Sequence, residues 1–430
     1  MRELPIWERA GVLDAAACKR VESYYAQQTE HNLSWGSIAF AVLGALLIGG
    51  GILLVFAHNW ELLTRPVRAA LSLCPLLIGG VVSFMAIRRG RVAWCEFSGI
   101  FHALAVGAAI ALIGQTYHLP SNTPGFLLVW ALLVLPLSFV LPSLGAFLIY
   151  LALIGGWAGA AQSEYGHALG FWLLLLPALV RLGQLLRKDR AGFEALLALW
   201  GLILLLVVAL GLVLERTVPG LWLLAYASFF SLLGLLGLRF YPAASGWSNP
   251  LGTLSWLGMS IFSYILTWEA VWDDIGWISV RSSWNYQAWG IGADLAIIVL
   301  FATAAGVLML KSFATDRFAV LTYGAFAFLA CLGFYLSSSL PTLNWLSSLL
   351  FNCFVLSLGL VYLVRGSRAA QLRQVNYGMA ILALLLVTRF FDSDIGFLLR
   401  GMVFIVMGVG FLATNLLIAR KQKYAAGGAI

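Results

Sequence analysis

Charged residues are scarce in this sequence: they make up 10% of the 430 residues, whereas 62% are hydrophobic and the mean hydropathy is +0.94. A soluble domain carries about 25% charged and about 45–50% apolar residues. The chain also lacks any polar stretch long enough to form a separate soluble domain. These deficits exclude an ordinary soluble protein and predict a chain that is solvated by lipid.

Motifs for nucleotide, zinc and serine-hydrolase chemistry are also missing, because the sequence contains no GxxxxGK[ST], HExxH or GxSxG pattern. ATP-driven transport by this chain alone is therefore not expected. The five cysteines form no CxxC pair, and most lie inside apolar runs. We expect buried thiols rather than a disulfide or metal framework, and we predict no cofactor and no metal.

A cleavable signal peptide is not expected, because Glu3, Glu8, Asp14 and Glu22 interrupt the beginning of the chain. Residues 1–35 are predicted to form a small cytoplasmic helical cap, in which Asp14 is the N-cap of a helix that reaches about Gln28. Residues 36–430 are predicted to form one multi-pass transmembrane bundle.

Apolar segments long enough to cross a bilayer follow one another almost without pause, which predicts an all-α polytopic bundle of about fourteen transmembrane helices. They lie near residues 36–57, 66–88, 94–117, 124–141, 143–161, 167–186, 192–214, 219–240, 250–268, 288–310, 317–337, 342–364, 374–390 and 395–419. The fourth and fifth segments are separated only around Pro142, so a single re-entrant hairpin is the alternative there. Either choice leaves the orientation of the later helices unchanged.

The basic residues predict the orientation of the bundle. If the N-terminus lies inside, every Lys and Arg falls on the cytoplasmic side except Arg65, Arg68, Arg216, Arg281, Arg389 and Arg400. An error of one helix in the count would disrupt this alternation midway along the chain. The pattern therefore predicts an even number of helices with both termini in the cytoplasm, and it explains the net charge of +8 without nucleic-acid binding.

Two groups of polar residues near the predicted outer side are candidates for a substrate-binding or ion-coupling site. Gln115 and His118 end the third segment, where a polar turn can either bind a ligand or satisfy the carbonyls of a helix end. The second group is Asp392, Asp394 and Arg400 near the C-terminus, to which we add Asp294.

An isolated arginine that lies within the membrane, below its outer surface, destabilises the protein by several kcal/mol unless it is paired. We therefore expect Arg400 to pair with Asp294 across the bundle, either as a structural clasp or as part of a coupling site. Arg389 and Asp392 are three residues apart and are expected to interact locally.

Other polar positions have structural interpretations. Asn344, Ser348 and Asn352 share one helix face, which predicts hydrogen bonds between helices or, alternatively, a polar transport path. Residues 269–287 are predicted to form an interfacial outer loop, although its acids Asp273 and Asp274 also fit a divalent cation or a glycosyl-transfer site.

Glu96, His102 and Glu194 fall on the predicted inner half of the bundle. We expect Glu194 to act at a helix start and His102 to be a packed histidine. Glycines at 44, 49–51, 401, 408 and 410 are expected to support close helix packing.

The order of these features resembles a bacterial family of predicted membrane proteins with a domain of unknown function (DUF family 2157). The resemblance rests on the N-terminal cap, on Gly44–Gly49, on Asn59-Trp60 and on Gly114–His118 followed by the helix of Trp130. It covers about residues 1–160 best. It implies a bacterial cytoplasmic (inner) membrane, and it implies no activity and no catalytic residues.

We expect a secondary transporter, flippase or channel-like protein whose partners are the lipid bilayer and a small-molecule, ion or lipid substrate. The alternatives are a non-catalytic membrane scaffold or envelope-stress component and, less favoured, a membrane-embedded lipid or glycan enzyme. The predicted site consists of Gln115, His118, Asp294, Asp392, Asp394 and Arg400. The sequence does not indicate the oligomeric state.

Overall fold

A computed structural model describes residues 14, 16–20, 63–90, 92–120, 122–217, 221–242, 246–281, 288–314, 316–369, 371–390 and eight positions between 398 and 412. Within these residues every regular element is a helix, so the all-α prediction is confirmed. Asp14 Oδ1 accepts a hydrogen bond from the Ala17 backbone N–H at 2.6 Å, as expected for an N-cap. The rest of the predicted cap lies outside the described residues.

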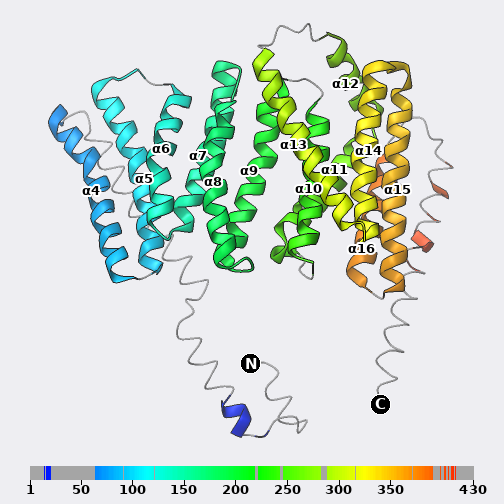
Figure 1. Ribbon diagram of the computed structural model, residues 1–430, viewed down its shortest axis with the longest axis horizontal. Coiled ribbons are helices and arrows are strands. Elements are labelled where there is room, and N and C mark those ends of the chain that lie inside the picture. Colours follow the sequence, from blue (N-terminus) through cyan, green and yellow to red (C-terminus); the bar gives the residue numbers. More distant parts are fainter. Residues whose placement is uncertain are drawn as a thin grey trace.

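The helices of the described part are joined by short connections, and most of them run from end to end of the bundle (Figure 1). They are α4 (Arg65–Arg89), α5 (Val92–Tyr117), α6 (Thr123–Val140), α7 (Leu144–Tyr165), α8 (Gly170–Lys188), α9 (Phe193–Thr217), α10 (Trp222–Phe240), α11 (Pro250–Ile265), α12 (Glu269–Arg281), α13 (Ala288–Ser312), α14 (Arg317–Ser339), α15 (Asn344–Arg368) and α16 (Leu372–Phe390). Two short 3₁₀ turns, Gly246–Ser248 and Pro341–Leu343, precede α11 and α15.

Ten helices of the described part are long and apolar enough to span a membrane. Every predicted span between residues 66 and 390 coincides with a helix, including the separate helices α6 and α7 on either side of Pro142. Of these helices, α11 and α16 are not among the ten. The predicted spans 36–57 and 395–419 lie outside the described residues, apart from isolated positions of the second.

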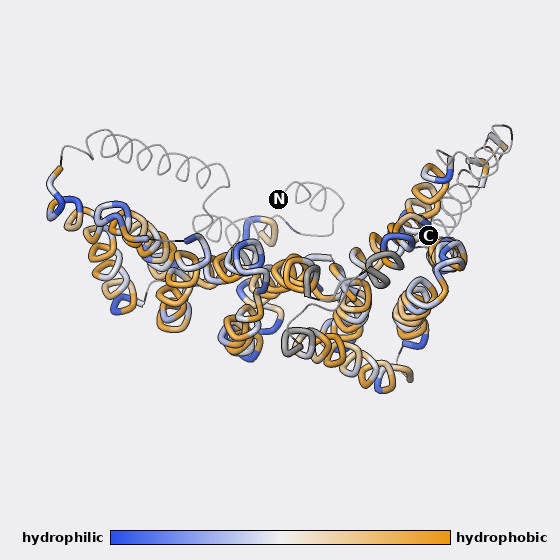
Figure 2. Tube along the Cα trace, turned by 90° about the horizontal axis from the view of Figure 1, so that it is seen from above, coloured by the Kyte–Doolittle hydropathy of each residue, from blue (hydrophilic) through white to orange (hydrophobic). Residues whose placement is uncertain are grey.

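The helices stand side by side in a long curved row that begins with α4 and ends with α15 and α16 (Figures 1 and 2). Helix α10 is the most buried of the candidate spans, and it packs against α9, α11, α13 and α14. Large apolar side chains such as Leu77, Leu173 and Leu310 are exposed on the outside of the row. A surface of this kind is stable against hydrocarbon, which agrees with a multi-pass membrane protein.

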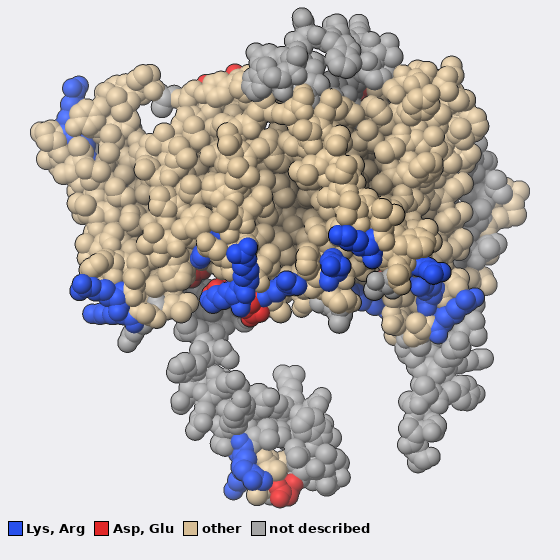
Figure 3. Space-filling view, in the orientation of Figure 1, with Lys and Arg blue, Asp and Glu red and all other residues tan. Residues whose placement is uncertain are grey.

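Basic side chains gather at one end of the bundle, which we call the basic face (Figure 3). It consists of the described residues Arg88, Arg89, Arg187, Lys188, Arg190, Arg239, Lys311, Arg317, Arg365, Arg368 and Arg373. The other end, where α5 ends and α15 begins, is called the opposite face. This separation is the one that the alternating charge pattern of the sequence predicts.

Two polar contacts near the basic face and one packed histidine join neighbouring helices. The Glu96 carboxylate on α5 accepts hydrogen bonds from the backbone N–H groups of Leu144 and Gly145 at 3.0 and 3.1 Å, and so caps the start of α7. At the start of α9, Glu194 lies 3.5 Å from Lys188 Nζ, in an exposed ion pair. His102 packs against Gly79 of α4, as expected for a packed histidine.

Glycine provides the closest approach between the last two described long helices. A Cβ atom at Gly378 of α16 would lie 2.6 Å from the Gly359 carbonyl oxygen of α15, which is a backbone atom that cannot move away. By contrast, no described atom lies within 4 Å of a Cβ built at Gly401, Gly408 or Gly410. The packing role expected for these three glycines is therefore not supported by any contact in the described part of the chain.

Candidate functional site

Gln115 and His118 line a cavity of about 950 Å³ at the opposite face, between the end of α5 and the start of α6. His118 has φ 52°, the left-handed conformation that usually belongs to glycine after a helix C-terminus. The Leu119 N–H donates to the Gly114 carbonyl at 3.0 Å and closes this turn. The predicted polar turn thus forms part of the wall of a cavity. Among the described residues, the side chains of Gln115 and His118 make no hydrogen bond.

Asn122 joins the two sides of this cavity. Its side-chain oxygen accepts from the Gly125 N–H at 2.9 Å and caps α6, while its amide nitrogen donates to the Tyr165 hydroxyl at the end of α7. Apart from Thr123, the rest of the cavity wall is apolar and includes Ile110 and Phe126. The site therefore offers hydrogen-bonding groups next to an apolar surface.

The side chains of the other predicted site residues lie outside the described part of the structure. Asp294 belongs to α13, but its side chain lies outside the description. Asp392, Asp394 and Arg400 lie outside the described residues altogether. The proposed pairs Asp294–Arg400 and Arg389–Asp392 consequently remain predictions.

A helix is interrupted inside the bundle on the side of the opposite face. Helix α11 ends at Ile265 and α12 begins at Glu269, whereas the span predicted from the sequence continues to residue 268. Thr267 lies in the break and is buried. A break leaves carbonyl groups without helical partners, and within a membrane such groups must find other donors.

The Thr267 carbonyl obtains these donors from two other helices. Ser348 Oγ and Asn352 Nδ2 of α15 both donate to it, the second at 3.0 Å. Arg389 Nη2 of α16 donates to the same oxygen, and Arg389 Nε donates to Asn352 Oδ1 at 3.1 Å. We call these four residues the carbonyl seam. The predicted polar face of α15 is thus confirmed as a set of hydrogen bonds between helices.

Residues 269–281, predicted as the first part of an interfacial loop, form the helix α12 instead. Trp272 is fully buried rather than interfacial, and its Nε1 donates to the Leu266 carbonyl at 2.8 Å. Asp273 accepts a hydrogen bond from Asn344 at 2.7 Å, and both Asp273 and Asp274 are exposed. The described residues contain no group of three or more side chains suited to a metal ion.

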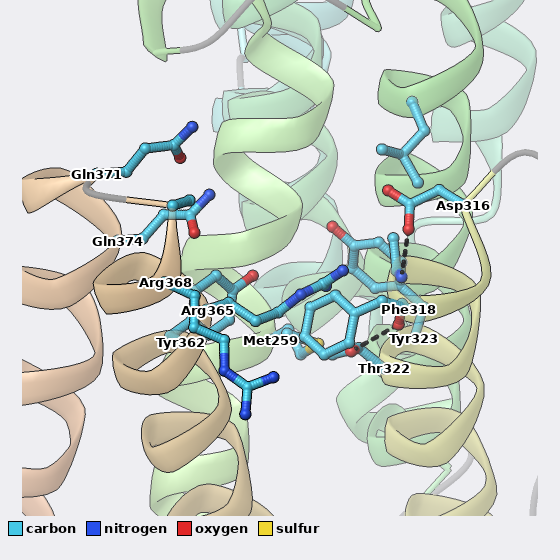
Figure 4. A pocket seen from close by; sticks show the side chains of 13 residues that line it. Met259, Asp316, Phe318, Thr322, Tyr323, Tyr362, Arg365, Arg368, Gln371 and Gln374 are labelled. Atoms are coloured by element: carbon cyan, nitrogen blue, oxygen red, sulfur yellow. Dashed lines mark hydrogen bonds between the residues drawn. The ribbon is translucent and has the colours of Figure 1, made fainter.

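A second polar cavity, of about 730 Å³, opens at the basic face where α10, α11, α14 and α15 meet the start of α16 (Figure 4). We call it the basic-face pocket; its wall includes Asp316, Tyr323, Arg365, Arg368, Gln371 and Gln374. Sequence reasoning assigned the two arginines only to an inner loop. The available signal was that Arg365, Arg368, Gln371 and Gln374 lie within one short stretch.

Comparisons with known proteins identify the N-terminal part of the chain. Neither the curated proteins nor the solved structures give a match. The family model described as predicted membrane protein (DUF2157) matches residues 5–147, which include the opposite-face cavity but not the carbonyl seam or the basic-face pocket. The resemblance expected from the sequence is confirmed over this range, in which residues 5–147 match the model of that family of predicted membrane proteins.

Proposed function

We propose that this multi-pass membrane protein is a secondary transporter, flippase or channel-like protein of the bacterial cytoplasmic membrane, with its basic face in the cytoplasm. The orientation is supported by the concentration of arginine and lysine at one end of the bundle. Gln115 and His118 in the opposite-face cavity, together with Asp294, Asp392, Asp394 and Arg400, are the proposed substrate or ion-coupling residues.

The observation that carries this proposal is the interrupted helix α11–α12 with the carbonyl seam. Transporters use discontinuous helices at their substrate sites, where unwound carbonyls and helix ends become available for binding. Asn352 lies two helical turns, about 12 Å, along α15 from Asn344, so the seam reaches well below the opposite face. Burying an arginine at this depth in a membrane is energetically unfavourable, and an arginine that is kept there more often has a functional role.

The experiment tests whether the seam meets water. In a background without the native cysteines, Ser348→Cys is expected to react with a membrane-impermeant maleimide added from the side of the opposite face, because a transport path is hydrated. The control is Ala158→Cys, at a fully buried position of α7, which should remain unlabelled. If Ser348→Cys is as unreactive as the control in folded protein, the seam is dry and the transport proposal fails.

The second candidate is a non-catalytic membrane scaffold or envelope-stress component. It is favoured by the fact that Ser348, Asn352 and Arg389 all bond to one protein carbonyl, as a permanent clasp between helices would. A lipid or glycan enzyme has less support, since the exposed carboxylate of Asp273 already accepts a hydrogen bond from Asn344.

A further inference from the structure

The basic-face pocket has a charged rim and an aromatic floor. Arg365, Arg368 and Asp316 stand at the rim and are exposed. The floor is formed by Met259, which is fully buried, and by Tyr323, which is nearly so. A cavity that changes from charged to apolar with depth at a membrane surface is matched to an amphiphile, whose own polarity changes in the same way.

The two arginines are available for an anion. Among the described residues, no carboxylate lies within ion-pair distance of Arg365 or Arg368. The ion pair found in the described part of the chain, Lys188–Glu194, lies away from this pocket, between the end of α8 and the start of α9. Arg365 is held by an aromatic ring instead: its guanidinium carbon lies 3.9 Å from the centre of the Phe318 ring (Figure 4). Stacking occupies the face of a guanidinium and leaves its N–H groups free to donate in the plane.

The one acid of the rim does not neutralise this pair. Asp316 Oδ1 accepts from the Ala319 N–H at 3.1 Å and caps the first turn of α14. Its negative charge is therefore directed to the positive end of that helix. Gln371 and Gln374, at the start of α16, add amide groups to the same wall. The rim therefore carries the two positive charges of Arg365 and Arg368 and the single negative charge of Asp316, which already accepts a hydrogen bond from α14.

We propose that the basic-face pocket binds the phosphodiester headgroup of an anionic membrane lipid, with Arg365 and Arg368 as its ligands and the start of the acyl region against the aromatic floor. Arginine binds phosphate oxygens through two parallel N–H bonds, which a zwitterionic headgroup offers less favourably because its own cation competes. Basic pockets between membrane helices are suited to anionic headgroups for this reason. The site is independent of the carbonyl seam and of the transport proposal.

The test measures lipid binding to the full purified chain in detergent by native mass spectrometry. Phosphatidylglycerol and phosphatidylcholine with identical acyl chains are the two probes, and inorganic phosphate is the soluble competitor. The double variant R365Q/R368Q is compared with R88Q/R89Q, which removes the same charge from the same face. Arg88 is a close match, because it also stacks on an aromatic ring, 4.7 Å from the centre of Phe84.

The wild-type chain should prefer phosphatidylglycerol, and R365Q/R368Q should weaken its binding about thirty-fold, as the loss of two headgroup contacts predicts. R88Q/R89Q should retain the wild-type affinity. Should the double variant not fold, R368Q alone is expected to weaken binding about five-fold. Equal losses in the two double variants would reveal diffuse charge attraction instead of a site. Equal binding of the two lipids, or displacement by inorganic phosphate, would also overturn the proposal.

Discussion

The contact between Glu96 and the start of α7 leads to a quantitative prediction. Glu96→Ala removes the acceptor of the Leu144 and Gly145 N–H groups, which belong to the first turn of α7 and have no partner within the helix. A hydrogen bond to a charged group contributes about 1.5–3 kcal/mol, and the loss of a helix cap costs about 0.5–2 kcal/mol. Because Glu96 is only partly buried, we expect a value near the lower limit for hydrogen bonds to a charged group, a loss of about 1.5–2 kcal/mol.

The free energy of unfolding is measured by titrating the purified chain in mixed micelles with a denaturing detergent and following tryptophan fluorescence. Glu96→Gln retains one acceptor oxygen and should lose about 1 kcal/mol. The control is Glu164→Ala, an exposed position near the other end of α7, where a change within about 0.5 kcal/mol is expected. If Glu96→Ala unfolds with the same midpoint as Glu164→Ala, the cap does not contribute to stability and the reasoning is wrong.

Three further substitutions test the packing of the second half of the chain, each by the same unfolding titration. Gly378→Ala should destabilise the chain by about 1–3 kcal/mol, because the new methyl group meets the backbone of Gly359. A wild-type midpoint would show that α15 and α16 can move apart at this point without a loss of stability. Asn352→Ala should cost about 1–3 kcal/mol, since Arg389 loses an acceptor, and an unchanged midpoint would mean that the seam adds no stability. Trp272→Phe should lower the free energy of unfolding by about 1 kcal/mol, because the hydrogen bond to the Leu266 carbonyl is lost. The helix content measured by circular dichroism should stay unchanged. A loss of helix content would show that Trp272 does more than hold the Leu266 carbonyl.

The helices were predictable because a long apolar run has few alternatives in lipid. Every backbone polar group must be satisfied within the segment, so a run of about twenty apolar residues becomes a helix. The spacing of Asn344, Ser348 and Asn352 likewise predicted a shared polar face, since residues four apart lie on one side of a helix. An apolar run and the spacing of polar residues along it are properties of a single segment, so they can be recognised in the sequence alone.

The break at Thr267 and the basic-face pocket depend on relations between segments. No glycine or proline lies between Ile265 and Glu269, and the span predicted from the sequence continues to residue 268, so the sequence offers no reason to end α11 inside the bundle. Asp316 and Arg365 are far apart in the sequence and appear as ordinary loop charges until α14 and α15 place them on one rim. The partners of Arg389 show the same limit, because Asn352 and Thr267 are brought to it only by packing.

The shortness of α11 affects the lipid next to it. Its 16 residues correspond to about 24 Å at 1.5 Å per residue, whereas the hydrocarbon layer is about 30 Å thick. Leu257, Ile261 and Ile265 are exposed on this helix, so the hydrocarbon layer meets an apolar wall that is shorter than its own thickness. The bilayer compensates for such a mismatch by thinning locally, and the membrane beside α11 should be thinner than that beside the longer helices of the row.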